Sequence, residues 1–280
     1  MELLGSLFNL SVVVFVVATM LSMGLALDLS QIIAPLKKPL LVADVLVTNF
    51  LLVPLLALLV LFLVPVDEGT KIGLILLSLA AGAPFTPKLA ELAKGDTALA
   101  TAVMLLQMVV TVLILPFALP LMLGGDVSVD SLAIANSLVV MMLIPLAIAL
   151  WVKAKFETVA ATWQGRMVKL SNLALLMLIV LMTILHGKDV LGVSWYDMVA
   201  VVLFMVASLF IGYIAGGKLY HNRVVSSLSA GQRNVSAALV VAAQNFDDPK
   251  VSIIIIAVSV IGLFLLIGAA KMFVKENLNL

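Results

Sequence analysis

Two polar segments interrupt otherwise apolar stretches of this sequence, and both combine helix-disrupting residues with a fixed positive charge. Their residues of interest are Gly82, Pro84, Thr86, Pro87, Lys88 and Glu91 in the first segment, and Gly231, Gln232, Arg233, Asn234 and Ser236 in the second. Two prolines three residues apart predict a broken helix, because each proline removes a backbone donor and clashes with the preceding turn. Freed backbone groups and helix-end dipoles beside a cation are suited to binding an anion.

Arg233 and Lys88 are the two cations available for such an anion. An arginine at membrane depth costs roughly 2.5 kcal/mol or more, so Arg233 must face protein or water. We expect it to act at the binding site; the alternative is a structural ion pair or a clamp on backbone carbonyls. Lys88 is expected beside the same site, although its side chain could instead extend to the water interface. Glu91, one turn away, could pair with Lys88 or carry a coupling proton.

Neutral polar residues complete the predicted site. They are Asn49, Thr86, Gln232, Asn234 and Ser236. Four of them lie in the two interruptions, where polar groups seldom face lipid. Asn49 belongs to another apolar stretch and could line a cavity or bond a neighbouring helix. Asp44, near the start of that stretch, could cap the interface or relay a proton.

The sequence argues against an enzyme. Cysteine is absent, and the two histidines, His186 and His221, stand far apart at predicted helix ends, which disfavours a zinc site. The phosphate-loop, HExxH and GxSxG motifs are missing. Ser229 and Ser236 have no histidine at comparable depth to activate them. We therefore predict no catalytic residue, no metal centre and no cofactor, with sodium the one ion to consider.

Composition indicates that the chain lies in a membrane. Hydrophobic residues make up 64% of its 280 residues and charged residues 11%, whereas a soluble domain carries about 25% charged residues. A net charge of +1 offers no basic surface for nucleic acid. A membrane-spanning helix needs about 20 apolar residues, and this length predicts nine spans. They are residues 6–28, 40–64, 70–94, 97–123, 131–152, 166–185, 195–217, 224–245 and 251–273.

Charges at the ends of these spans predict an orientation. The lysines and arginines gather on one side, and they include Lys37, Lys38, Lys94, Lys153, Lys155, Lys218 and Arg223. Acidic residues predominate in the loops of the opposite side. Because cytoplasmic loops carry an excess of Lys and Arg, we expect an inner-membrane protein with its N-terminus outside and its C-terminus in the cytoplasm.

The two interrupted spans occupy matching places in the chain. Each is the third of four spans, and they cross the membrane in opposite directions. This pattern predicts one unit, residues 1–280, made of a first repeat at 1–123, a connecting helix at 131–152 and a second, inverted repeat at 166–273. Paired interrupted helices in inverted halves indicate a transporter site near the membrane centre.

At these residues the chain resembles the bile acid:sodium symporter family. The strongest matches are residues 82–96, which end in Leu92-Ala93-Lys94-Gly95-Asp96, and residues 229–243. The resemblance covers nearly the whole chain. It implies a panel domain, a core domain with two crossed, interrupted helices, and uptake of an organic anion coupled to sodium. Many members have ten helices, and this chain looks like one that lacks the first.

The chain departs from that family where sodium ligands are expected. By motif, Thr86 and Pro87 stand where the family has a Ser-Asn pair. Ser229 replaces a Glu and Arg233 replaces a Gln, while Asn234 remains. The carboxylate that would favour sodium is therefore lost, and two fixed cations, Lys88 and Arg233, appear beside the same crossover.

We accordingly predict a secondary transporter of a small or medium organic anion that works by alternating access. Lys88 and Arg233 are expected to replace bound sodium, so that transport is independent of sodium. Three alternatives remain: a sodium-coupled symporter with a residual sodium site, an anion channel, and a non-transporting membrane sensor. The expected partners are the substrate and the lipid bilayer, and no oligomeric state is predicted.

Overall fold

The computed structural model describes residues 2–28, 39–124 and 130–278, and every regular element in these ranges is a helix. Seven of the helices are long and apolar enough to cross a membrane. They are Leu3–Ala26, Pro39–Leu63, Thr97–Leu123, Ser131–Lys155, Glu157–Leu191, Trp195–Ala215 and Pro249–Lys275. The prediction of an all-α membrane protein is confirmed. The other two expected spans are the interrupted ones, and the count of nine stays a prediction. Lys37 and Lys38 lie outside the described ranges.

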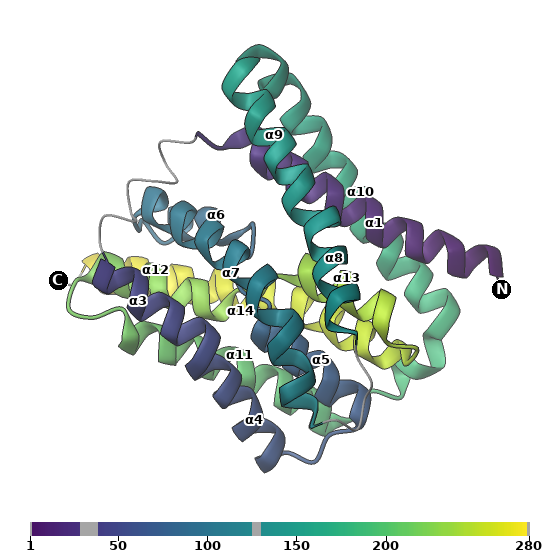
Figure 1. Cartoon of the computed structure of the whole chain (residues 1–280). Helices are drawn as coiled ribbons and strands as arrows, with labels where there is room; N and C mark the ends of the chain where they lie inside the picture. The colour runs from purple at the N-terminus through teal and green to yellow at the C-terminus, as the bar shows by residue number, and fades with distance from the viewer. Residues whose placement is uncertain (1, 29–38, 125–129, 279–280) are drawn as a thin grey trace.

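One group of helices forms a panel at the edge of the molecule (Figure 1). It consists of α1 (Glu2–Ala26), α10 (Glu157–Leu191), and the span built from α8 (Ser131–Leu138), η3 (Val139–Leu143) and α9 (Ile144–Lys155). α1 packs along both α9 and α10. We call these helices the panel.

The panel differs most from the sequence prediction at the boundary between α9 and α10. Residues 153–165 were expected to connect two spans, but α10 already begins at Glu157. Hydropathy measures which residues suit lipid, and it does not detect a helix that continues beyond the bilayer. Lys153 pairs with Glu157 at 2.9 Å across the junction, so charged side chains stabilise the extended helix end outside the apolar region.

The remaining helices form a core around the two interrupted segments. They are α3 (Pro39–Val47), η2 (Thr48–Leu52), α4 (Val53–Leu63), α7 (Thr97–Leu123), α11 (Trp195–Ala215) and α14 (Pro249–Leu278). η2 and η3 are single π-helical turns, and each precedes a proline, Pro54 or Pro145, in the first turn of the next helix. A proline donates no backbone hydrogen bond, and the wider turn accommodates that gap without ending the span.

Both predicted interruptions are present. The first separates α5 (Glu68–Leu79) from α6 (Thr86–Leu92), and the second separates α12 (Tyr220–Gly231) from α13 (Val235–Asn245). Pro84 lies in the first connection, and Pro87 falls in the first turn of α6, where its missing donor is not needed. Gly231 is the last residue of α12. The expected pair of interrupted helices is therefore confirmed.

Gly82 sets the direction of the chain in the first interruption. Its φ is +77°, in the left-handed region that favours glycine. A Cβ atom added there would lie 2.4 Å from the backbone nitrogen of Met108 and 2.6 Å from the carbonyl oxygen of Met104, both in α7. The break is therefore held directly against the backbone of α7, with no room for a side chain.

Replacing Gly82 by alanine should lower the thermal unfolding midpoint strongly. The matched control is Gly124→Ala, because Gly124 also has a φ of +77° but a Cβ there meets nothing within 4 Å. The control should cost only the left-handed strain, roughly 1–2 kcal/mol, whereas Gly82→Ala must also displace α7. Equal midpoints for the two purified variants would contradict this account of the break.

Candidate functional site at the helix crossover

The two interruptions are hydrogen-bonded to each other, and Asn234 makes the connection. Its backbone N–H donates to the carbonyl of Ala80 at 2.8 Å, and its side-chain Nδ2 donates to the carbonyl of Gly82 at 3.0 Å. Its Oδ1 accepts from the backbone N–H of Ala237 at 3.1 Å, which caps α13. One buried side chain thus starts a half-helix and ties it to the opposite break.

Thr111 of α7 holds the other side of the first connection. Its Oγ1 accepts from the backbone N–H of Ala81 at 3.0 Å and lies 3.1 Å from the Ala81 carbonyl, to which it donates. The side chain is fully buried. Sequence reasoning missed this residue, because a threonine in an apolar helix ordinarily bonds a carbonyl of its own helix.

Arg233 is the central side chain of the crossover, and only 2% of it is exposed. Its Nε donates to the carbonyl of Leu77 at 2.9 Å, and its Nη2 donates to the carbonyl of Ser78 at 2.6 Å. Its Nη1 donates to Oδ1 of Asn49 at 2.8 Å and to the carbonyl of Ala230 at 3.3 Å. Three roles were considered for Arg233: anion binding, a structural ion pair and a clamp on backbone carbonyls. These contacts are those of the clamp.

The positive charge of Arg233 is solvated by neutral oxygens. Within the described ranges no carboxylate forms an ion pair with it; the four bonds go to three carbonyls and one amide. The carbonyls of Leu77 and Ser78 can accept from Arg233 because α5 ends at Leu79, so neither receives the usual bond from the residue four positions on; Leu77 keeps only a 3.2 Å bond from the N–H of Ala80. The break therefore creates the acceptors that the buried guanidinium requires.

Ser229 stands one turn before Arg233, at the position where a carboxylate would favour sodium. Its hydroxyl donates to the carbonyl of Ser226 at 3.0 Å, and Nε2 of Gln107 approaches it at 3.5 Å. All three residues are fully buried. The side chains of Ser229, Ser226 and Gln107 at this part of the crossover are all neutral.

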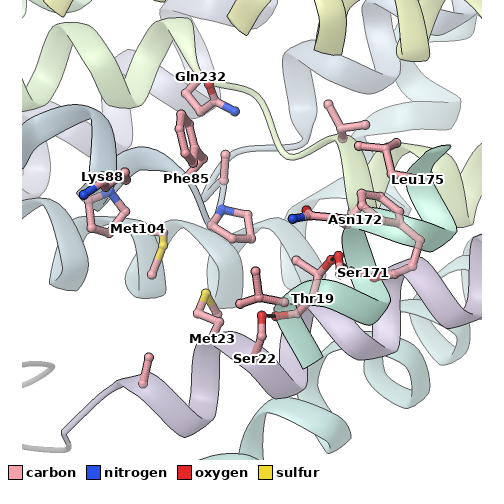
Figure 2. Close-up of a pocket in the computed structure, with 18 of the residues that line it drawn as sticks. Thr19, Ser22, Met23, Phe85, Lys88, Met104, Ser171, Asn172, Leu175 and Gln232 are labelled. Carbon is pink, nitrogen blue, oxygen red and sulfur yellow. Dashed lines mark hydrogen bonds between the residues drawn. The ribbon is translucent and has the colours of Figure 1, made fainter. Parts of the chain in front are cut away.

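A cavity of about 950 Å³ separates the crossover from the panel (Figure 2). On the crossover side it is lined by Lys88 and Glu91 of α6, by Gln232, by Arg233 and by Ser236 in the first turn of α13. Ser236 is 3% exposed. The first turn of a helix carries backbone donors without intrahelical partners and a partial positive charge. In α13 the N–H groups of Val235 and Ala237 are already bonded, to the carbonyl of Arg233 and to Oδ1 of Asn234. The wall therefore combines cationic groups with the partial positive charge of the helix start.

Lys88 and Glu91 face the cavity as an exposed pair. Nζ of Lys88 lies 2.8 Å from Oε2 of Glu91, and their side chains are 54% and 61% exposed. Lys88 is therefore not part of the buried cluster around Arg233. Exposed ion pairs of this kind contribute about 0–1 kcal/mol, so a second anion could exchange with Glu91 as the partner of Lys88.

The predicted site residues thus divide into a group that lines the cavity and a buried group that does not. The lining group is Lys88, Glu91, Gln232, Arg233 and Ser236. Asn49, Thr86 and Asn234 are fully buried and do not line the cavity. Among the described residues Oγ1 of Thr86 has no hydrogen-bond partner. Asp44 belongs to neither group, because it is exposed on α3 and lines a separate shallow pocket with Lys218. The structure does not bring Asp44 to the crossover.

Five polar residues on the panel side of the cavity were missed. They are Thr19 and Ser22 of α1 and Gln164, Ser171 and Asn172 of α10. Four of them belong to predicted spans, where a few polar residues are ordinarily explained by helix packing, and Gln164 belongs to the stretch expected to connect two spans. The available signal was the presence of those four within predicted spans, where a polar group that does not face lipid must face protein or a cavity.

Removing the Asn49–Arg233 hydrogen bond should reveal that the two residues act together. Arg233→Met and Asn49→Ala should each lower the free energy of unfolding by about 1–3 kcal/mol, since each leaves buried polar groups unpaired. The double variant should differ from their sum by about 0.5–3 kcal/mol. The control is Arg223→Met with Asn49→Ala, because Arg223 bonds the distant Tyr213 carbonyl. The free energies of unfolding are measured in detergent. If the losses are additive both for Arg233→Met with Asn49→Ala and for the control pair, the clamp is contradicted.

Comparison with known proteins gives a family for this architecture. A family model described as the sodium bile acid symporter family matches residues 13–193. That range runs from α1 to the end of α10 and contains the first interruption, whereas Arg233 and the second interruption lie beyond it.

Two curated proteins are also similar, and both are described as probable sodium/metabolite cotransporter BASS3, chloroplastic. The protein from Oryza sativa subsp. japonica is 23% identical over 195 residues, which cover 69% of this chain and 46% of the relative. The protein from Arabidopsis thaliana is 28% identical over 131 residues, which cover 47% and 30%. The chain spans less than half the length of these relatives. Because the family model matches more than half of the chain, the protein belongs to the sodium bile acid symporter family.

Proposed function

We propose that the protein is a secondary transporter of an organic anion that works by alternating access and does not use sodium. Family membership and relatives described as sodium/metabolite cotransporters support transport of a small molecule across a membrane. Independence of sodium is supported by one observation in particular. The guanidinium of Arg233 already occupies a buried cluster of neutral oxygens at the crossover.

A sodium ion at this crossover would need oxygen ligands and would have to tolerate a fixed positive charge. The acceptors of Leu77, Ser78 and Asn49 are engaged by Arg233. Two unit charges about 5 Å apart repel by roughly 3 kcal/mol at an effective dielectric constant of 20. Residue 229 is a serine, so this position supplies no carboxylate to offset that repulsion. In this proposal, the guanidinium of Arg233 takes the structural role of a bound sodium ion.

The anion site we propose is the cavity wall formed by α13, with Lys88 facing it. Ser236 lies in the first turn of α13, and Arg233 lies behind that turn. A carboxylate there gains the partial positive charge of the helix start. Arg233 is held by its clamp, so it acts through its field, whereas the exposed Lys88 can contact the anion directly.

Alternating access would be a movement of the core against the panel. The cavity opens between α1 and α10 of the panel and α6 and α13 of the core. Further along α13, the hydroxyl of Ser137 on α8 donates a hydrogen bond to Oε1 of Gln244, which connects panel and core on the opposite side. With the positive-inside orientation, the cavity faces the cytoplasm of an inner-membrane protein, with the N-terminus outside. A cavity on one side and a panel–core bond on the other support a transporter over a channel.

Organic anions should stabilise the purified protein equally in sodium and in potassium. The probes are monocarboxylates from acetate to octanoate together with gluconate, each added to protein in either chloride salt, and the readout is the thermal midpoint. In the double variant Ser229→Glu/Arg233→Gln, which restores the residue types the family has there, stabilisation should require sodium. An anion effect in the wild type that needs sodium would overturn the proposal.

Freeing Lys88 from its internal partner should strengthen anion binding. Glu91→Gln removes the competing carboxylate, so the probe that binds best should bind about threefold to tenfold more tightly, while Lys88→Met should weaken it. The matched control is Glu68→Gln, which breaks the similar Lys71–Glu68 pair on α5, 3.2 Å long and away from the cavity. An unchanged dissociation constant in both Lys88 and Glu91 variants would exclude this pair from the site.

A further inference from the structure

Two hollows lie next to each other on the surface of the core, between α11 and the span formed by α3, η2 and α4. This span packs along α11 (Figure 1). The first hollow is the shallow pocket at Asp44, about 400 Å³ in volume, and the second is a groove of about 490 Å³. Ala215, the last residue of α11, lines the groove, and the next residue, Gly216, lines the pocket. The pocket and the groove are therefore neighbours along one seam.

The groove is lined only by apolar side chains. They belong to four leucines of η2 and α4, among them Leu55 and Leu59, and to Ile211, Ile214 and Ala215 of α11. Leu55, Leu59 and Ile214 are more than half exposed. Both walls belong to helices long and apolar enough to cross a membrane. The groove therefore faces the lipid and suits an acyl chain.

The pocket lies where these two spans end. Pro39, the first residue of α3, lines it, and so does Gly216, which follows the end of α11. Lys218 and Asp44 also line it; both are exposed, and they carry opposite charges. Among the described residues neither of these two side chains forms an ion pair. The pocket thus offers a ligand one positive and one negative group at the membrane surface.

The Lys218 side of the pocket suits a phosphate. α12 begins at Tyr220, and its N-cap residue, Leu219, provides no side-chain hydrogen bond to the first backbone N–H groups. The start of a helix carries a partial positive charge, and its free N–H groups readily bind phosphate. Leu219 and Asn222 line the pocket together with Lys218. The charge of the lysine and that of the helix start therefore act at the same place.

We propose that the pocket and the groove together bind one phospholipid with a primary amine in its headgroup, of the phosphatidylethanolamine type. The phosphate lies at Lys218 and the start of α12, the ammonium lies at Asp44, and an acyl chain lies in the groove. The lipid thereby joins α3 to α12, the two helices that lead to Asn49 and to Arg233. This inference is independent of the proposed function, because the residues of both hollows lie outside the lining of the cavity between core and panel.

Asp44 is the residue that distinguishes this headgroup from others. A primary ammonium donates charge-assisted hydrogen bonds to a carboxylate. The cation of phosphatidylcholine has no N–H group, so it cannot donate such a bond. Phosphatidylglycerol has no cation to offset its phosphate, so its net negative charge is repelled by the carboxylate.

The test measures lipid binding to the delipidated full chain by native mass spectrometry in detergent. Phosphatidylethanolamine, phosphatidylglycerol and phosphatidylcholine, all with dioleoyl chains, are added separately. Phosphatidylethanolamine should bind about fivefold more tightly than either of the others, the effect of one additional hydrogen bond, and should raise the thermal midpoint most. Free phosphoethanolamine should not bind at the same concentrations, because it has no chain to bury in the groove.

Two variants assign the headgroup contacts. Asp44→Asn should weaken phosphatidylethanolamine binding about fivefold and remove its advantage over phosphatidylglycerol. Lys218→Met should weaken the binding of both lipids, because both carry the phosphate. The control is Lys169→Met, since Lys169 is an exposed lysine of α10 that lines neither hollow; it should leave both affinities unchanged.

Several outcomes would overturn the inference. They are equal binding of the three lipids, binding of none of them, and a preference for phosphatidylethanolamine that survives Asp44→Asn. Free phosphoethanolamine that binds as tightly as the lipid would show that the groove plays no part. A stable dimer that takes up none of the lipids would assign the seam to a second copy of the chain. None of these results bears on the anion site.

Discussion

A positive charge inside a membrane protein must be solvated by the protein itself, and the core of this molecule is organised around that requirement. Arg233 is almost fully buried and finds neutral oxygens on α5, η2 and α12. A continuous helix would have used the carbonyls of Leu77 and Ser78 for its own hydrogen bonds. The interruption of α5 frees the Ser78 carbonyl and leaves the Leu77 carbonyl a 3.2 Å bond from Ala80, so that both can also accept from Arg233. The break and the buried arginine therefore depend on each other.

The same arrangement connects the buried cluster to the cavity. Asn234 follows Arg233 in the sequence, caps α13 and bonds the first interruption. The start of α13 is thereby fixed at the cavity wall, where Ser236 faces the open space. On the other side stand the panel helices, which contact the core at the opposite end through Ser137 and Gln244. A core packed beside a panel is the arrangement that the proposed alternating access would use.

Much of this fold follows from residue types that have strong local effects. Pro84, Pro87 and Gly82 predicted the first break, and an arginine in an apolar stretch predicted a protein-lined crossover. The beginning of α10 at Glu157 was not predicted, because hydropathy reports the lipid environment rather than helix length.

The hydrogen-bond partners of the site residues could be identified only from the three-dimensional structure. Asn49 is 184 positions from Arg233 in the sequence, and no spacing rule connects them. Lys88 and Arg233 were expected to act at one place, yet one is exposed in the cavity and the other is clamped. Thr111 and the panel hydroxyls were missed because isolated Ser and Thr residues in spans usually bond their own helix. Which of them also face a cavity depends on how the helices pack.

The most direct test of the central claim is calorimetric titration of sodium chloride into the purified protein, with choline chloride as the reference. If Arg233 takes the place of a bound ion, the wild-type protein should give no saturable heat beyond that of choline. Saturable sodium binding to the wild-type protein, reduced by Asn234→Ala, would contradict the claim and place a sodium site at the crossover.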